Sequence, residues 1–407
     1  MATKDFGLGL AVPRDSSEIG YVVHVKVIDE QIVVNFPIPS LQNPIARIAH
    51  DFLHCQMYSG EKLTVMHYRP NTGADGTQCG QHGVADAVFA GAYLEEVDLR
   101  ACKNTSCISP SLREFLDRPP LTRGSTVDSI KVDMPWCETL ISKRTTPAGT
   151  FAVELSASIR SNVNGVTLTE QVSLEHKSDD VTPIVDRFTF LLSIHQLSLI
   201  LTRHIENAHS FSCEFLEKEE LIRCQLFPPV QDESKPQHTF GSRRITLKET
   251  GLDLETLVAN WIPQAHKIAP SLGIFERWLT TRANDRLNET DLFMLIQSHE
   301  IFFNRLYGDD GKLSEKLKKL IGSWLGIFGF TNAEQTCVDI SNTRNWFTHF
   351  NPKYDKQEKE RSYANMDSFG MLLQITYPAL LLQLLKAPDD SVRAYLARAA
   401  AEHASYF

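Results

Sequence analysis

The hydrophobic pattern of this chain changes its period once, and that change constrains the fold more than any other feature. Up to about residue 180, short runs alternate apolar and polar residues, and clusters of Gly, Asn, Pro or Ser separate the runs. Alternation with a period of two is typical of strands with one buried face. From about residue 251 onward, apolar residues recur every three or four positions, as in amphipathic helices. The sequence therefore predicts an α+β fold, with a β-rich N-terminal domain followed by an all-α bundle.

The strand pattern is interrupted by one helix. It is expected to begin at Thr182-Pro183, because Thr caps helices well and Pro fits the first helical position, and to end near residue 203. The segment Asn162-Val163-Asn164-Gly165 has the composition of a hairpin turn. We expect strands at 21–27, 31–38, 62–68, 129–134, 150–156, 166–174, 211–216 and 221–227.

A polar, Pro-rich stretch that starts at residue 228 shows no period and predicts an exposed linker over 228–250. The linker separates a β-rich domain at 1–230 from a helical domain at 251–407. In the helical domain, Thr290 is expected to cap one helix. Asn351-Pro352 is expected to end another, because the residue before a proline avoids the helical region. The expected helices cover 290–306, 312–327, 333–350, 357–386 with a bend at Pro378, and 389 or 391 to 403.

The overall charge limits how this chain can bind nucleic acid. The 41 basic and 50 acidic residues leave a formal net charge of -9. Proteins that coat long nucleic acids are basic, so any RNA binding must use a local patch or a narrow pocket. Eight cysteines spread through 407 residues favour a reducing compartment, and the N-terminus lacks the pattern of a secretion signal. Two apolar runs, 188–201 and 371–385, are too short for membrane spans. A cytoplasmic protein without membrane contact is expected.

The segment 344–349, with sequence R-N-W-F-T-H, concentrates reactive side chains on one face of a predicted helix. At 100° per residue, with Arg344 at 0°, Thr348 falls at about 40°, Asn345 at about 100° and His349 at about 140°. Trp346, Phe347 and Ile340 occupy the remaining arc, from about 200° to about 320°. One face can therefore anchor in a core while Arg, Asn and His share a cleft.

These residue types suit the cleavage of RNA by its own 2′-hydroxyl. Histidine is the side chain best suited to move a proton near neutral pH, and Asn345, four residues before His349, is placed to orient the imidazole. An arginine supplies a fixed positive fork as charge builds on the phosphate. No metal is needed for this chemistry. A structural alternative also fits the pattern: Arg344 pairs with an acid on a neighbouring helix, Asn345 caps, and His349 is a solvated residue at the helix end.

R-N-x-x-x-H in an all-α C-terminal domain resembles the HEPN superfamily, and more narrowly the Apea-like HEPN proteins, whose helical domain follows a β-rich domain. The stretch 188–195 and the paired strands around 211–227 also resemble the end of that N-terminal region. The resemblance implies metal-independent endoribonuclease activity and a homodimer whose motif helices form one composite site. It further implies a role in bacterial defence against phage.

The resemblance also implies an acidic residue on an early helix that braces the motif arginine, and Glu300 is the candidate, with Thr348 as a second supporting residue. Beyond the motif, Lys353, Tyr354 and Lys356 are candidates for holding RNA, since the aromatic ring offers a stacking face. A solvated helix face is the alternative for this segment, because acids are interspersed.

Cys79, His82, Cys102 and Cys107 have a spacing compatible with four tetrahedral ligands of a structural zinc ion. The first pair lies in a Gly-rich stretch and the second in a polar one. The alternative is that the thiols are unrelated and buried separately. No cofactor is expected for catalysis.

The sequence thus predicts a HEPN endoribonuclease in which Arg344, Asn345 and His349 are catalytic. The expected partners are RNA, with tRNA as one candidate, a second copy of the chain, and a phage-derived trigger. Residues 1–230 are expected to be a sensor or regulatory domain, or to position the substrate. The competing hypothesis is a catalytically inactive HEPN module that binds RNA or a protein partner.

Overall fold

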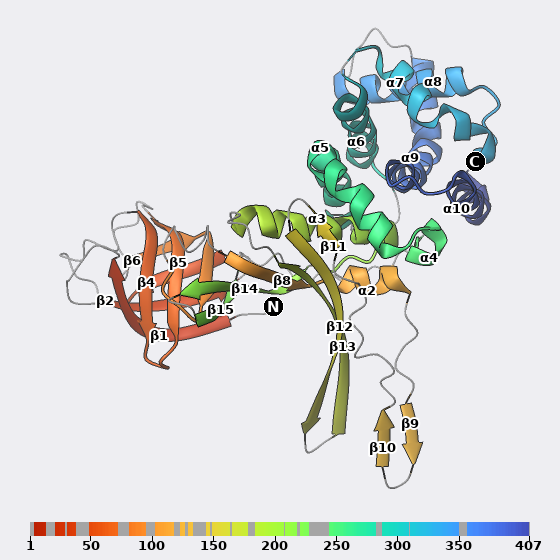
Figure 1. The fold of residues 1–407 in the computed structure, drawn as a ribbon. Coiled ribbons are helices and arrows are strands. Elements are labelled where there is room, and N and C mark those ends of the chain that lie inside the picture. The colour runs from red at the N-terminus through yellow and green to blue at the C-terminus, as the bar shows by residue number, and fades with distance from the viewer. Residues whose placement is uncertain are drawn as a thin grey trace. The chain divides into compact units, whose positions relative to one another are not determined.

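A large antiparallel sheet precedes a helical region, which confirms the predicted α+β class (Figure 1). The computed structural model describes residues 4–13, 21–28, 31–37, 49–71, 81–94, 102–117, 123–126, 129–132, 144–146, 149–162, 165–177, 184–206, 208–217, 220–227, 244–281, 287–308, 310–349 and 356–406. The chain divides into two compact units. The β-rich unit contains 1–110, 134–192 and 206–236, and the helical unit contains 111–133, 193–205 and 237–407.

This division is more interleaved than a single cut near residue 230. Two segments from the N-terminal half, 111–133 and 193–205, belong to the helical unit, so the boundary falls inside helix α3 (Ile184–Thr202). Most of the linker expected at 228–250 lies outside the described residues, up to residue 243. Its last part is not a linker, because Thr246 caps the short helix α4 and Ile245 is fully buried.

Thirteen strands of the β-rich unit form one sheet in the order β11-β12-β13-β8-β14-β15-β7-β5-β4-β1-β2-β3-β6. The strands β9 and β10 pair separately in the helical unit. The strands are β1 Lys4–Pro13, β2 Tyr21–Ile28, β3 Gln31–Phe36, β4 His50–Met57, β5 Lys62–Pro70, β6 Gln81–Ala85, β7 Ala87–Ala90, β8 Cys102–Ile108, β9 Arg123–Thr126, β10 Ser129–Val132, β11 Arg144–Thr146, β12 Gly149–Asn162, β13 Gly165–Lys177, β14 His209–Glu217 and β15 Glu220–Phe227.

An additional pairing of β5 with β6 closes six of these strands into a ring. Inside the ring, alternate residues of β2, β3 and β4 are buried, as the valines of β2 show at positions 23, 25 and 27. This alternation of buried and outward positions is what the sequence pattern predicted for 21–27. Val34, Leu53 and Val65 from three further strands are also fully buried. The ring is therefore held by its ladders and by an aliphatic interior.

Two residues explain how the ring closes. His67 has a φ of 51°, in the left-handed region, and this break in the strand shifts the alternation so that Tyr68 is buried while His67 is exposed. The imidazole of His67 lies 3.0 Å from Asp86. The seam of the ring is the place where β5 pairs with β6. Across this seam, Gly83 has no room for a side chain, because a Cβ there would lie 2.3 Å from the ring of Tyr68 and 2.4 Å from the carbonyl oxygen of Arg69. Glycine thus lets β6 approach β5.

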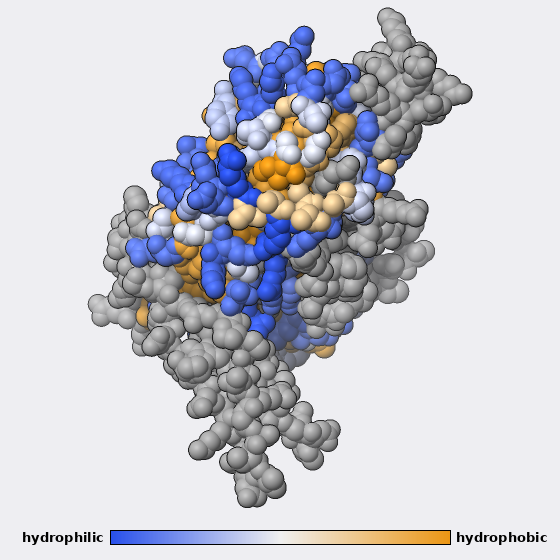
Figure 2. Space-filling model, turned by 90° about the vertical axis from the view of Figure 1, so that its right-hand side faces the viewer, coloured by the Kyte–Doolittle hydropathy of each residue, from blue (hydrophilic) through white to orange (hydrophobic). Residues whose placement is uncertain are grey.

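The helical unit contains long helices connected by short segments. Within the described part of the chain, none of the helices combines the length and the apolar character that crossing a bilayer requires. Hydrophilic residues surround a smaller hydrophobic area on the face drawn in Figure 2. The helices of this unit are α2 Pro110–Leu116, α4 Leu247–Thr250, α5 Leu254–Thr281, α6 Glu289–Tyr307, α7 Leu313–Ile321, the 3-10 helix η3 Gly322–Phe328, α8 Ala333–His349, α9 Lys356–Leu384, α10 Asp389–Glu402 and the 3-10 helix η4 Ala404–Tyr406, together with the end of α3.

A polar network lies in the core between α5, α6 and α9. The Ser271 hydroxyl donates to the carbonyl oxygen of Ser298 at 2.7 Å and lies 2.6 Å from the Tyr377 hydroxyl. His299 is fully buried, with Nδ1 2.8 Å from the Leu295 carbonyl oxygen. A carbonyl oxygen only accepts, so Nδ1 carries the hydrogen. Burial lowers the pKa of His299 to about 4, so the ring is neutral at pH 7.

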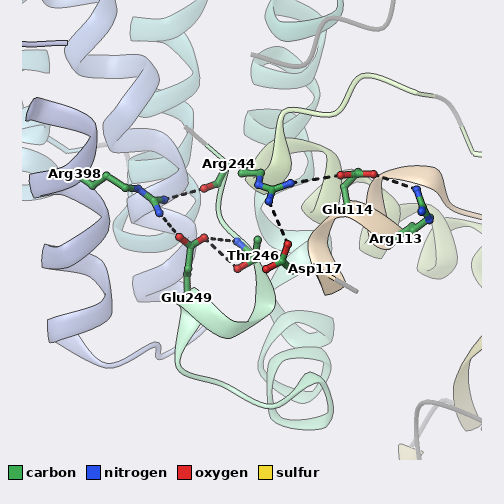
Figure 3. Close-up of polar contacts among 7 residues, drawn as sticks. All are labelled: Arg113, Glu114, Asp117, Arg244, Thr246, Glu249 and Arg398. Atoms are coloured by element: carbon green, nitrogen blue, oxygen red, sulfur yellow. Dashed lines mark hydrogen bonds and ion pairs between the residues drawn. The ribbon is translucent and has the colours of Figure 1, made fainter. Parts of the chain in front are cut away.

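Polar contacts also connect α2, the segment before α4, and α10 (Figure 3). Arg244 lies 3.6 Å from Glu114 and 3.2 Å from Asp117, and its carbonyl oxygen accepts a 2.9 Å hydrogen bond from Arg398. Arg398 also pairs with Glu249. Burial alone would raise the pKa of Glu249, but the hydrogen bond from Arg398 contributes to lowering it below its usual value. These contacts fasten residues 110–117 to the helical unit.

Candidate active site

The first half of the candidate site comes from α6. Asn288 caps this helix: its side chain accepts from the backbone N–H of Asp291 at 2.9 Å, and the Asp291 carboxylate accepts from the Asn288 N–H at 2.9 Å. The expectation that Thr290 caps the helix is wrong, because the reciprocal Asn288–Asp291 pair satisfies the free amides two residues earlier. The cap fixes the start of α6, and Glu300 lies in its second half.

The second half comes from α8, whose buried stripe sets the orientation of the motif. Ile340 is fully buried, Thr343 is 3 % exposed and Phe347 is 9 % exposed. Arg344 and Asn345 lie beside this stripe and are partly buried. The expected aromatic anchor is therefore Phe347, while Trp346 is only partly buried. The stripe directs the motif arginine toward α6.

Arg344 is held from three directions. Its Nη2 atom lies 3.7 Å from Oε2 of Glu300, and its Nη1 atom donates to the Asn345 side-chain oxygen at 3.2 Å. The guanidinium carbon lies 6.0 Å from the centre of the Phe293 ring. The side chains of Arg344 and Glu300 are 29 % and 24 % exposed, so the ion pair is shielded but still reached by solvent. A pair of this kind contributes about 1 kcal/mol at most and serves chiefly to orient the guanidinium.

The structure thus brings Glu300, Arg344 and Asn345 together, as the sequence led us to expect. Phe293 was not predicted. It lies seven residues before Glu300, and seven residues make almost two full helical turns, so both side chains fall on the same face of α6. An aromatic residue seven positions from a bracing acid was the available signal. A cation–π contact of this kind helps to hold the guanidinium in place.

The remaining motif residues occupy the end of α8. Thr348 and His349 lie in its last turn, and His349 is the final helical residue. Their side chains lie outside the described residues. Helical geometry places position 349 on the same face as Asn345, one turn further along. Lys353 and Tyr354 also lie outside the described residues, and Lys356 is the first residue of α9, with a side chain that is not described.

The described members of the predicted zinc set are not brought together. His82 is on β6, with Nε2 3.0 Å from the Asn71 amide nitrogen, whereas Cys102 and Cys107 are on β8, which is separated from β6 by β5, β7, β15 and β14 in the sheet. Burial raises the pKa of the Cys107 thiol to about 12 and also raises that of Cys102, which disfavours the thiolate that zinc requires. Cys79 lies outside the described residues, so the zinc site stays a prediction. Among the described residues, no group of three or more His, Cys, Asp or Glu side chains is arranged for a metal ion.

The assembled residues can bind and polarise an anion. The guanidinium of Arg344 has five N–H donors, its Nη1 and Nη2 atoms contact Asn345 and Glu300, and its side chain is 29 % exposed to solvent. Such a fork matches two oxygens of a phosphate. No protein-family model, curated protein or solved structure matches this chain.

Proposed function

We propose that the helical unit is a HEPN-type endoribonuclease that cleaves RNA without a metal ion. The observation that carries the proposal is the braced guanidinium of Arg344, held by Glu300 and Asn345 on the helix that ends at His349. A side chain fixed in this way needs little reorganisation when charge develops on a phosphate. The spacing along α8 puts the histidine one turn beyond the amide that contacts the arginine.

In the proposed reaction, the 2′-hydroxyl of one ribose attacks the adjacent phosphorus. His349 acts as general base for the hydroxyl proton or as general acid for the 5′-oxygen that leaves. Arg344 stabilises the negative charge on the phosphorane oxygens. Asn345 holds the guanidinium and is placed to orient the imidazole. The bond from phosphorus to the 5′-oxygen breaks, so the products are a 2′,3′-cyclic phosphate and a 5′-hydroxyl.

The proposal extends to the partners that the sequence resemblance implies. Two chains would associate through their helical units, so that two copies of His349 and Arg344 line one cleft. The substrate would be cellular or phage RNA in the cytoplasm, tRNA included, and a phage product acting through the β-rich unit would release the activity. The net charge of -9 favours a local site over broad coating of RNA.

The test is RNA cleavage in the presence of EDTA. We expect the wild-type protein to cut RNA and the His349→Ala variant to lose at least about 100-fold of the rate, because general acid–base catalysis contributes that much or more. His266→Ala is the matched control, since His266 is an exposed histidine on α5. It is expected to cut like the wild type.

One observation favours the alternative of a catalytically inactive module that binds RNA or a protein. Glu300 already offsets part of the positive charge of Arg344, as in a purely structural ion pair. The same experiment separates the two functions. Intact RNA under every condition tested, or equal cutting by wild type and His349→Ala, would contradict the enzymatic proposal and leave the binding module.

A further inference from the structure

We propose that Tyr307, the last residue of α6, forms a stacking subsite for a base of single-stranded RNA next to the candidate active site. The inference rests on the proposed function and names the form of RNA that the site takes. Tyr307 is 68 % exposed, more than any other large apolar or aromatic side chain among the described residues. An aromatic ring that far exposed at a helix end is an accessible π-face.

The ring of Tyr307 is exposed but its position is supported. Its centre lies 5.1 Å from the centre of the Phe303 ring, at an angle of 40°. Phe303 itself is buried, at 3 % exposure, so it provides a rigid base for the tyrosine. The backbone is fixed as well, since the N–H of Gly308 donates to the Asn304 carbonyl oxygen at 3.1 Å. A supported ring loses less conformational entropy when a base stacks on it.

Tyr307 lies on the same face of α6 as the residues that hold the motif arginine. Phe293, Glu300 and Tyr307 are spaced by seven residues, so their side chains follow one line along the helix. The seven residues from Glu300 to Tyr307 correspond to about 10 Å along the axis. A single strand a few nucleotides long covers that length, so one RNA segment can place a phosphate at Arg344 and a base at Tyr307.

Exposed cations accompany the ring. Lys319 on α7 has its Nζ atom 5.6 Å from the centre of the Phe303 ring, directly beside the aromatic pair. Arg305 and Lys312, on either side of the turn that follows α6, are exposed too. An exposed aromatic ring with a lysine close to its supporting ring suits a nucleobase whose phosphates need counter-charges. Lys319 provides one such counter-charge next to the ring that supports Tyr307.

A subsite of this kind selects unpaired RNA and tolerates any base. Every base has a π-face, so stacking on a ring does not depend on which base is present. Bases in a duplex are stacked on one another and do not reach the ring. The preferred substrates are therefore loops or single-stranded ends, cut a few nucleotides from the stacked base.

Binding to an RNA that cannot be cut tests the subsite. A 2′-O-methyl oligonucleotide lacks the attacking hydroxyl, and a 2-aminopurine in it reports stacking by fluorescence quenching. We expect Tyr307→Ala to weaken binding by about 5- to 150-fold and to abolish the quenching, because stacking contributes about 1–3 kcal/mol per base. Tyr307→Phe keeps the ring and is expected to bind like the wild type. Tyr58→Ala is the matched control, since Tyr58 is 65 % exposed in the β-rich unit.

Three outcomes overturn the inference and identify what failed. If Tyr307→Ala binds like the wild type while His349→Ala abolishes cleavage, the subsite is wrong and the ribonuclease stands. If the wild type neither binds the oligonucleotide nor cuts RNA, the proposed function fails and the subsite with it. If Tyr307→Ala changes the sedimentation coefficient of the protein, the ring is a contact with a second copy of the chain.

Discussion

The two units of this protein are stabilised by different interiors. The closed ring of the β-rich unit is filled almost entirely by aliphatic and aromatic side chains that point inward from alternate positions. The helical unit buries Ser271, Ser298, His299 and Tyr377 in a hydrogen-bonded network at the meeting point of three helices. In the closed ring of strands, backbone hydrogen bonds between neighbouring strands fix how the strands are arranged. Packed helices have no backbone hydrogen bonds between them. Buried polar partners can specify one packing of such helices, because any other packing leaves polar groups unsatisfied.

The candidate site depends on the polar network in the core of the helical unit. Glu300 is the residue after His299, so the network that fixes His299 also fixes the turn of α6 that carries the bracing carboxylate. A site that requires a guanidinium in one orientation benefits from a core that allows only one orientation of α6. The core of the ring is built from hydrophobic side chains, and the special positions of the ring are His67 and Gly83, which close it.

The largest effect is expected at the seam of the ring. Gly83→Ala places a Cβ 2.4 Å from the Arg69 carbonyl oxygen, and a backbone atom cannot move aside as a side-chain end can. We expect a loss of about 3 kcal/mol in the free energy of unfolding, at the upper end for overpacking. Denaturation by guanidinium chloride, followed by circular dichroism, measures it, and amide exchange should locate the damage in β5 and β6.

The matched control is Gly273→Ala in α5, where nothing lies within 4 Å of the added Cβ. Replacing a glycine inside a helix is expected to raise the free energy of unfolding by about 0.5–1 kcal/mol. Equal effects of the two substitutions would show that the seam is not a tight contact, and the contrast between the units would lose its basis.

Acid is expected to weaken the helical unit through His299. Its pKa is about 4 when folded and about 6.5 when unfolded, so between these values only the unfolded chain binds the proton. The stability that depends on a neutral His299 is fully present above pH 6.5. As the pH falls toward 4, the free energy of unfolding decreases by about 3 kcal/mol. Tryptophan fluorescence during denaturation at several pH values measures it, because Trp261, Trp278, Trp324 and Trp346 all lie in the helical unit. In His299→Gln the slope of stability against pH should be smaller. An unchanged slope would refute the assignment.

A smaller effect is expected from the hydroxyl of Tyr377. Tyr377→Phe removes its hydrogen bond with Ser271 but keeps the ring stacked on Phe275, whose centre lies 4.2 Å away. We expect a loss of about 1 kcal/mol in the free energy of unfolding. Ser271→Ala and the double variant complete a cycle whose coupling energy should have the same size. Additive effects would mean that the network does not act as a unit.

Much of the fold could be predicted because the spacing of apolar residues along the sequence indicates which positions are buried. The strands at 21–27, 62–68 and 166–174 and the helices α6, α8, α9 and α10 appear near their expected positions. The single helix expected at 312–327 is instead the α-helix α7, which ends at Ile321, followed by the 3-10 helix η3. The strand β4 was harder to predict, because its outward residues include His54 and Gln56, which do not distinguish a strand from a helix. Closure of the ring was not predictable, since it depends on the left-handed backbone at His67 and on the space at Gly83, and neither has a local pattern.

The sequence predicted the chemistry of the candidate site but only part of its geometry. The sequence placed Arg344 and Asn345 on one face and selected Glu300 as the brace, and these three residues meet in the structure. The helix expected at 290–306 did not show that Phe293 contacts Arg344, and it ended before the exposed Tyr307. A helical pattern shows which residues share a face. Which neighbour that face meets depends on tertiary packing.

The most direct test of the central claim uses the chemistry of the 2′-hydroxyl. Two RNA oligonucleotides with one preferred cleavage position are compared in EDTA, one of them with a single 2′-deoxynucleotide on the 5′ side of that position. The account predicts that the all-RNA substrate yields a 2′,3′-cyclic phosphate and a 5′-hydroxyl, and that the substituted substrate stays intact at that position. Cleavage of the 2′-deoxy substrate at the same position, or activity that EDTA abolishes, would contradict it.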